Sequence, residues 1–143
     1  MTESSLRPFH LAIAVHDLEA TRSFYCDQLG CTVGREAPRW IDFNFFGHQV
    51  SVHLVDGDDS PIATNPVDGD QVPSRHFGVV LDWENWQALG KKLKDSGQEF
   101  LIDPKTRFEG EPGEQGTFFL YDPSGNALEF KSFRDPSKLF ATD

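Results

Sequence analysis

Hydrophobic residues alternate with polar or small residues in several short runs, the first of which is FHLAIAV at residues 9–15. Such alternation is typical of a β-strand with one buried face. A helical pattern follows at residues 17–30, where Asp17 is suited to cap the helix and Gly30 to end it. Three more short strands are predicted at residues 31–36, 40–46 and 48–55.

The same order of elements returns after a Gly-, Pro- and Asp-rich stretch at residues 56–73, which we interpret as a linker. RHFGVVL at residues 75–81 predicts a strand, and residues 83–97 predict a helix with one apolar face. Three strands are then expected at residues 98–103, 117–122 and 126–133. Residues 104–115 separate the first two of these strands and are predicted to be a loop.

Each half therefore reads as β-α-β-β-β. The shift from His10 to His76 is 66 residues and the shift from Gly47 to Gly125 is 78 residues, so the difference is 12, about the length of the loop at residues 104–115. The two spacings agree once a single insertion in the second half is allowed for, which indicates an internal repeat. We predict an α+β fold in one domain, residues 1–143, whose tandem βαβββ modules (about residues 8–55 and 74–133) form a curved mixed sheet around a metal-binding cleft.

Side-chain parity selects three candidate metal ligands. Alternate residues of a strand face opposite sides, so His10, His76 and Glu129 all lie opposite the apolar residues of their own strands. Two imidazoles and one carboxylate make up the facial triad that suits a divalent metal, and burying Glu129 without a cation would be costly. A single histidine at a strand start is more often structural, but two at equivalent positions of a repeat favour a site.

The same parity places Ser51 and His53 opposite the core side of residues 48–55. An imidazole in this position could act as a general acid or base. An ordinary exposed histidine explains His53 equally well, and we assign no role to His16 or His48.

Composition narrows the class of partner. The formal net charge is −10 and no Lys/Arg cluster occurs, which argues against nucleic acid or an anionic membrane surface as a partner. The sequence has neither a signal-peptide pattern nor an apolar run of membrane-spanning length. Cys26 and Cys31 are the only cysteines, so we expect free thiols and a cytoplasmic protein. The thirteen Phe and three Trp residues could line part of a pocket.

Three segments carry a resemblance to a known family: FHLAIAVHDLEATRSFY with the following LGC, RHFGVVL, and YDPSGNALEF. Over residues 8–133 the chain resembles the vicinal oxygen chelate superfamily of glyoxalase, bleomycin-resistance and ring-cleaving dioxygenase proteins. It is most similar to small predicted extradiol-dioxygenase-like proteins. The resemblance implies paired modules that enclose a metal cleft, with ligands at His10, His76 and Glu129.

The sequence departs from parts of that family. Glutathione-dependent glyoxalases carry a ligand on the last strand of both modules, whereas the first module here has Ser51, with His53 two residues on. Ring-cleaving dioxygenases usually have a tyrosine where this chain has Phe119, and Tyr121 lies two positions later. They also use a further histidine in the second module, and none follows His76. His53 and Tyr121 are therefore the candidate catalytic residues.

We expect a metal-dependent, dioxygenase-like oxidoreductase that chelates a small, aromatic substrate through vicinal oxygens. Fe(II) is the preferred metal, and Zn, Ni, Mn or Co are the alternatives. Two other readings stay open: a glyoxalase-like lyase or isomerase that needs no oxygen, and a non-catalytic drug-binding resistance protein. By resemblance, a homodimer is also expected.

Overall fold

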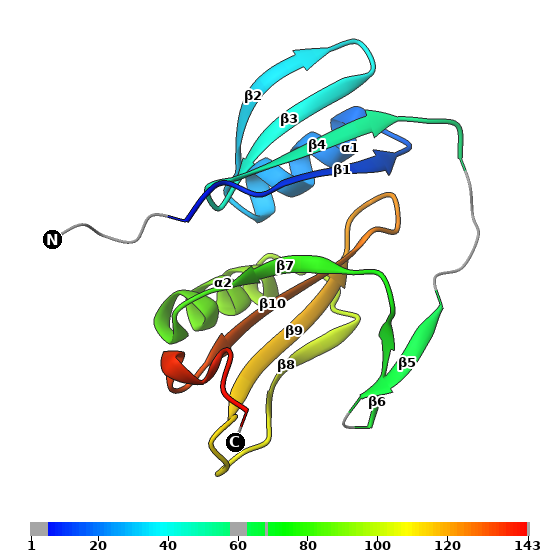
Figure 1. Ribbon diagram of the computed structural model, residues 1–143. Coiled ribbons are helices and arrows are strands. Elements are labelled where there is room, and N and C mark those ends of the chain that lie inside the picture. Colours follow the sequence, from blue (N-terminus) through cyan, green and yellow to red (C-terminus); the bar gives the residue numbers. More distant parts are fainter. Residues whose placement is uncertain (1–5, 58–62, 68, 143) are drawn as a thin grey trace, which may run out of the picture. The chain divides into compact units, whose positions relative to one another are not determined.

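The computed structural model describes residues 6–57, 63–67 and 69–142. The chain divides into two compact units, Met1–Asp58 and Asp59–Asp143 (Figure 1). Both units contain a four-stranded sheet with one parallel and two antiparallel strand pairs.

The sheet of the first unit has the strand order β1-β4-β3-β2. Its strands are β1 (His10–Val15), β2 (Thr32–Ala37), β3 (Trp40–Phe45) and β4 (His48–Leu54). The helix α1 (Leu18–Arg22) continues as a π-helical segment, η1 (Ser23–Gln28). The Asp17 side chain caps α1 by accepting a hydrogen bond from the Ala20 amide at 3.0 Å, and Gly30 follows the helix with a φ of 80°. Both terminus predictions are confirmed.

One face of this sheet packs against the helix. Tyr25 of η1 is fully buried, and its ring stacks on Phe43 of β3 with a centroid distance of 5.1 Å. Val15, Val50 and Val52 are buried on the same side, whereas His10 and His53 are exposed. The predicted parity of β1 and β4 is therefore confirmed.

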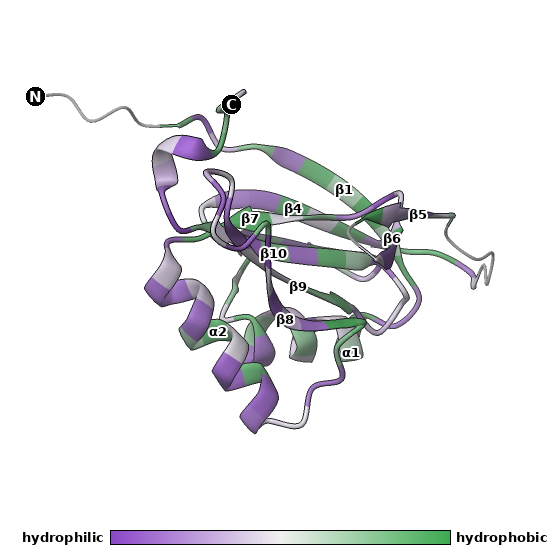
Figure 2. Ribbon diagram, turned by 90° about the horizontal axis from the view of Figure 1, so that it is seen from below, coloured by the Kyte–Doolittle hydropathy of each residue, from purple (hydrophilic) through white to green (hydrophobic). Residues whose placement is uncertain are grey.

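The sheet of the second unit has the equivalent order β7-β10-β9-β8. Its strands are β7 (Phe77–Val80), β8 (Ile102–Arg107), β9 (Gln115–Tyr121) and β10 (Ala127–Phe133). The helix α2 (Trp83–Asp95) covers one face, and a short 3-10 helix, η2 (Pro136–Lys138), follows β10. Figure 2 shows α2 as mostly hydrophilic, interrupted by hydrophobic positions, and its buried residues are Trp86, Gly90 and Leu93.

Trp86 fixes α2 to this sheet. Its indole nitrogen donates to the Phe130 carbonyl oxygen at 2.9 Å. The ring also lies so close to Gly116 of β9 that a Cβ there would come within 2.6 Å of it. The position therefore requires glycine, because no side chain fits between the strand and the indole ring.

Strand register confirms the internal repeat. Ala12 pairs with Ser51 in the parallel β1–β4 pair, and Gly78 pairs with Glu129 in the parallel β7–β10 pair. Gly47 and Gly125, with φ values of 89° and 86°, form the turns before β4 and β10.

One strand prediction is wrong in its position. The strand expected at residues 98–103 lies at Ile102–Arg107 and so enters the stretch predicted as a loop. Residues 102–107 include Pro104, which is untypical of a strand because proline cannot donate to a strand ladder. β8 is an edge strand with an irregular register between Ile102 and Lys105, and such positions tolerate proline.

Part of the stretch predicted as a linker is an ordered hairpin. It consists of β5 (Thr64–Val67) and β6 (Asp70–Pro73), and the turn residue Gly69 has a φ of 88°. Val72 of β6 is buried in a cluster with Ile102 and Phe119. The hairpin therefore packs on the face of the second sheet that carries Phe119. Within the described residues, no helix is long and apolar enough to cross a membrane.

Candidate metal and substrate site

His76 lies between the hairpin and the second sheet. It immediately precedes β7, and its Nδ1 is 2.7 Å from the Pro73 carbonyl oxygen. Because a carbonyl oxygen can only accept, Nδ1 carries the proton in this contact. The ring also packs edge-on against Phe119, at a centroid distance of 5.0 Å. These contacts fix the ring and direct Nε2 toward β10.

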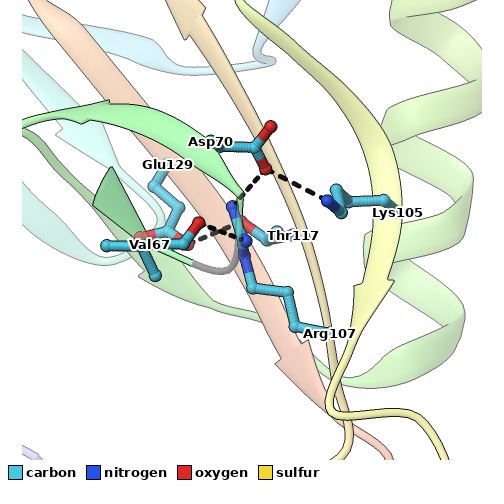
Figure 3. Close-up of polar contacts among 6 residues, drawn as sticks. All are labelled: Val67, Asp70, Lys105, Arg107, Thr117 and Glu129. Carbon is cyan, nitrogen blue, oxygen red and sulfur yellow. Dashed lines mark hydrogen bonds and ion pairs between the residues drawn. The ribbon is translucent and has the colours of Figure 1, made fainter. Parts of the chain in front are cut away.

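Glu129 of β10 lies beside that nitrogen. Its Oε1 is 3.2 Å from His76 Nε2, and the two side chains are 14% and 29% exposed respectively. The hydroxyl of Thr117, from the neighbouring β9, donates to Oε2 at 2.5 Å (Figure 3). Both carboxylate oxygens are thus held, one by each neighbouring side chain.

The contact between His76 and Glu129 shifts the pKa of both side chains. The hydrogen bond to Glu129 raises the pKa of His76, against the opposing effect of burial. Burial alone would raise the pKa of Glu129, but the hydrogen bonds from His76 and Thr117 outweigh it and lower that pKa. The charged forms of the pair, an imidazolium and a carboxylate, therefore stabilise each other.

The two side chains also fit a divalent metal. With Nδ1 protonated, a neutral His76 would direct its Nε2 lone pair at a carboxylate oxygen, so either a proton or a metal cation must lie between the two atoms. Two ligands at about 2.1 Å from one ion and at neighbouring coordination positions lie roughly 3 Å apart, close to the observed 3.2 Å. A backbone carbonyl on the second imidazole nitrogen is the usual support of a metal-binding histidine. His76 and Glu129 would hold the ion.

The third predicted ligand belongs to the first unit. His10 is exposed at the start of β1, where it pairs in register with Gln49. Within residues 6–57, 63–67 and 69–142, no group of three His, Cys, Asp or Glu side chains has metal-binding geometry. His76 and Glu129 are brought together, and the assignment of His10 as the third ligand stays a prediction.

The first unit has a different polar pair at the position that matches Glu129. The Ser51 hydroxyl donates to Asp42 Oδ1 at 2.6 Å, across the antiparallel β3–β4 pair. Both residues share the sheet face of His10 and His53. His53 pairs with Ala14, four residues along β1 from His10, which is about 13 Å of strand.

Tyr121 lies at the end of β9 and is 40% exposed. The residue that pairs with Glu129 in register is Phe119, which is almost fully buried. Tyr121 faces the same side of the sheet two residues away. Its catalytic role stays a prediction.

A cavity of about 290 Å³ opens beside the His76–Glu129 pair. The rest of its lining comes from β5, β6, β8, β9, β10 and their adjoining turns: Val67, Val72, Arg107, Phe108, Gln115, Phe119 and Lys131. Most of the wall is apolar, and its two additional charged groups are both cations.

Arg107 joins the hairpin to the sheet. Its guanidinium donates to Asp70 Oδ2 at 2.9 Å and to the Val67 carbonyl at 3.1 Å, and Lys105 also donates to Asp70 Oδ2 at 3.1 Å (Figure 3). The hydrogen bonds that Lys105 and Arg107 donate to Asp70 both lower the pKa of this carboxyl group, and the one from Lys105 has the larger effect. The Arg107 side chain is only 4% exposed, so this contact fixes the hairpin over the cavity.

Comparison with known proteins agrees with this architecture. Residues 7–130 match the family model described as the Glyoxalase/Bleomycin resistance protein/Dioxygenase superfamily. The chain belongs to this superfamily. A search of curated proteins gives no significant match.

Solved structures include similar members of the superfamily. A glyoxalase/bleomycin resistance protein/dioxygenase from Alicyclobacillus acidocaldarius is 39% identical, with 94% of this chain and 96% of that chain covered and a TM-score of 0.80. A glyoxalase/dioxygenase from Nostoc punctiforme is 18% identical, with 94% and 100% covered and a TM-score of 0.67. A lactoylglutathione lyase from Agrobacterium tumefaciens is 16% identical, with 91% and 96% covered and a TM-score of 0.63. The last two show a shared fold.

Several residues of the site were not singled out by sequence. Arg107 and Phe108 lie in the segment predicted as a loop, and Asp70 lies in the predicted linker. Thr117 could have been found, because it opens the strand predicted beside that of Glu129. Asp42 was detectable in the same way, as the one acidic residue in the apolar run at residues 40–46.

Proposed function

We propose that this protein is a metal-dependent, dioxygenase-like enzyme that binds Fe(II) through His76, Glu129 and His10. The observation that carries the proposal is the 3.2 Å contact of His76 Nε2 with Glu129 Oε1, while Nδ1 is held by the Pro73 carbonyl. Superfamily membership supports a metal-binding vicinal oxygen chelate protein. The dioxygenase activity and the choice of iron are our own inference.

His10 enters this proposal from the repeat and from the family resemblance. It precedes Ala12 by two residues as His76 precedes Gly78, and Ala12 and Gly78 occupy matching register positions opposite Ser51 and Glu129. An imidazole at both positions supplies the second nitrogen ligand of a facial triad.

The chain's own residues have separate tasks in this proposal. Pro73 and Thr117 orient the two ligands of the second unit, and Phe119 forms a wall beside His76. A bound Fe(II) would supply a Lewis acid and a binding position for O₂. His53 and Tyr121 are the proposed acid–base residues, and each is exposed to solvent.

The test is metal content by elemental analysis of protein purified without oxygen or chelator. We expect about one iron per chain, together with O₂ uptake when catechols are supplied. If the protein instead contains zinc, nickel, cobalt or manganese and takes up no O₂, the activity is that of a lyase or isomerase and not of a dioxygenase. No metal, even after reconstitution, would contradict the whole proposal.

Variants then test each ligand. Glu129→Gln and His76→Ala should lose the metal, whereas Glu99→Gln, at an exposed glutamate elsewhere in the second unit, should keep it. His10→Ala should lower metal affinity, and His16→Ala is its control. If His10→Ala retains wild-type stoichiometry and affinity, His10 is not the third ligand.

A further inference from the structure

We infer that the second unit carries a pocket for a small aromatic monocarboxylate, with the ring between Phe108 and Phe119 and the carboxylate on Lys131. This inference rests on the proposed function, since it specifies which substrate would lie beside the His76–Glu129 pair. It adds a substrate class and a specificity residue to that site.

The size and lining of the cavity favour a small aromatic body. Its volume of about 290 Å³ is at the lower end of the range for small-molecule pockets. Val67, Val72 and Phe119 provide apolar walls on the hairpin and on β9. Val72 is anchored from behind by the buried cluster with Ile102 and Phe119, so this wall is preformed.

Phe108 points to a ligand because its backbone is strained. It directly follows β8 with a φ of 54°, a conformation that is an outlier for a bulky side chain. The ring lines the cavity, is 45% exposed, and no other aromatic ring stacks on it within the part of the chain described. Such strain occurs in turns and clusters at ligand and active sites. The exposed ring is therefore available to pack against the ring of a ligand.

The charges of the pocket favour one negative group on the ligand. Lys131 of β10 lines the cavity, and among the described residues no carboxylate lies at ion-pair distance from its ammonium group. Its Nζ lies 5.6 Å from the centre of the Phe133 ring. This lysine is on the same sheet face as Glu129, two residues along the strand. It can therefore receive a carboxylate while the rest of the ligand reaches the metal ligands.

Arg107 also favours a negatively charged ligand, but its guanidinium is not available to bind the ligand directly. Its guanidinium is already engaged by Asp70 and the Val67 carbonyl. Asp70 carries one negative charge between Lys105 and Arg107, so this cluster has a net charge of +1. A single open cation with a positive background fits a monocarboxylate, whereas a phosphate dianion would leave oxygens without donors.

The experiment compares benzoate with benzamide, two probes of similar shape that differ in charge. Binding is measured by NMR titration of the metal-free protein and of the zinc-loaded protein. We expect benzoate to bind at least fivefold more tightly than benzamide, with shifts at Phe108, Phe119 and Lys131. Lys131→Met, and the milder Lys131→Gln, should abolish the preference, and Lys92→Met on exposed α2 should keep it.

A second matched pair tests the aromatic wall. Phe46, in the turn between β3 and β4, has nearly the same backbone strain as Phe108, with a φ of 53°, but lies outside this cavity. Asn tolerates that conformation, so Phe108→Asn and Phe46→Asn should both fold. We expect Phe108→Asn to weaken benzoate at least threefold, and Phe46→Asn to leave its affinity unchanged.

The outcomes separate this inference from the proposed function. Equal affinity for the two probes, no binding of either, or a preference that survives both Lys131 variants would overturn the pocket. Metal binding is scored independently. If the protein binds no metal but prefers benzoate, the pocket is supported and the proposed metal-dependent enzyme is contradicted. If it binds metal without preferring benzoate, the pocket is contradicted and the metal site is supported.

Discussion

Gly78 and Glu129 lie directly opposite each other in the parallel β7–β10 pair, and a Cβ at position 78 would overlap the Glu129 carbonyl oxygen. The overlapping atom belongs to the backbone, so no side-chain rotation relieves it. The carboxylate of the site therefore depends on a residue with no side chain in the neighbouring strand.

Gly78→Ala should destabilise the protein by at least about 2 kcal/mol, because the added methyl group forces β7 away from β10. Gly34→Ala is the control, since its Cβ would meet Asp42 only at an ordinary distance of 3.6 Å. Denaturant unfolding measures both. Equal stability of the two variants would contradict the close approach of position 78 to the Glu129 carbonyl oxygen.

Thr117→Val should weaken both folding and metal binding. Thr117 is fully buried and donates to Glu129 Oε2, so valine keeps the shape but leaves the carboxylate without that donor. The expected loss is about 1–3 kcal/mol of unfolding free energy and roughly 10–100-fold in metal affinity. Thr117→Ser should restore most of both, and a serine variant no better than valine would contradict the role of the hydroxyl group.

Metal affinity should rise with pH. A metal needs the unprotonated Nε2 of His76, and the hydrogen bond to Glu129 raises the pKa at which that nitrogen loses its proton. Affinity should therefore increase by about tenfold per pH unit below this pKa and level off above it. Competition with a chelator at constant ionic strength measures the curve, and a flat profile would exclude His76 as a ligand.

The same pair should give metal-free protein a window of extra stability. The raised pKa of His76 contributes stability that is complete below about pH 6.5 and is lost as the pH rises through the raised value. The lowered pKa of Glu129 contributes stability above about pH 4.5 that is lost as the pH falls through the lowered value. A double-mutant cycle of His76→Ala and Glu129→Ala should show coupling near pH 5.5 that declines toward pH 9. Coupling that is unchanged at pH 9 would contradict this account.

Cys31 should resist alkylation. It is buried, and burial raises the pKa of its thiol to about 12, so the thiolate is scarce at neutral pH. Cys26 is partly exposed and its thiol pKa is also raised, so it should react slowly but first. Mass spectrometry after iodoacetamide treatment at pH 8 should find one label in native protein and two after unfolding. Rapid double labelling of native protein would contradict the packing of the first unit.

Periodicity was sufficient for most of the fold. The alternation in FHLAIAV and NALEFKSF correctly predicted the more buried face of β1 and of the middle of β10, because that face packs on a helix. It did not predict that Ala127 and Phe133, on the Glu129 face of β10, are buried as well. The family assignment is also confirmed. For β8, the proline at position 104 outweighed the pattern, because tolerance of proline depends on an edge position that the sequence does not reveal.

The site was predictable only where it depends on parity. Alternation of side chains along each strand places His76 and Glu129 on the same face of the sheet, and the structure brings the two side chains together. Arg107 and Asp70 contact each other across 37 residues of chain, and the short strands β5 and β6 contain two prolines, so no periodic signal marked them. Phe108 acquires its meaning from a backbone angle, which residue type alone did not predict.

The hydroxyl–carboxylate pairs of the two sheets show how the two halves differ. In one unit the hydroxyl stands on β4 and the carboxylate on β3; in the other the carboxylate stands on β10 and the hydroxyl on β9. The two pairs differ in register as well, because Asp42 lies directly opposite Ser51, whereas Thr117 lies opposite Lys131, two residues along β10 from Glu129. Each sheet thus keeps a hydroxyl–carboxylate pair on the face away from its helix, but only the second unit carries the acidic residue on its last strand, next to a histidine.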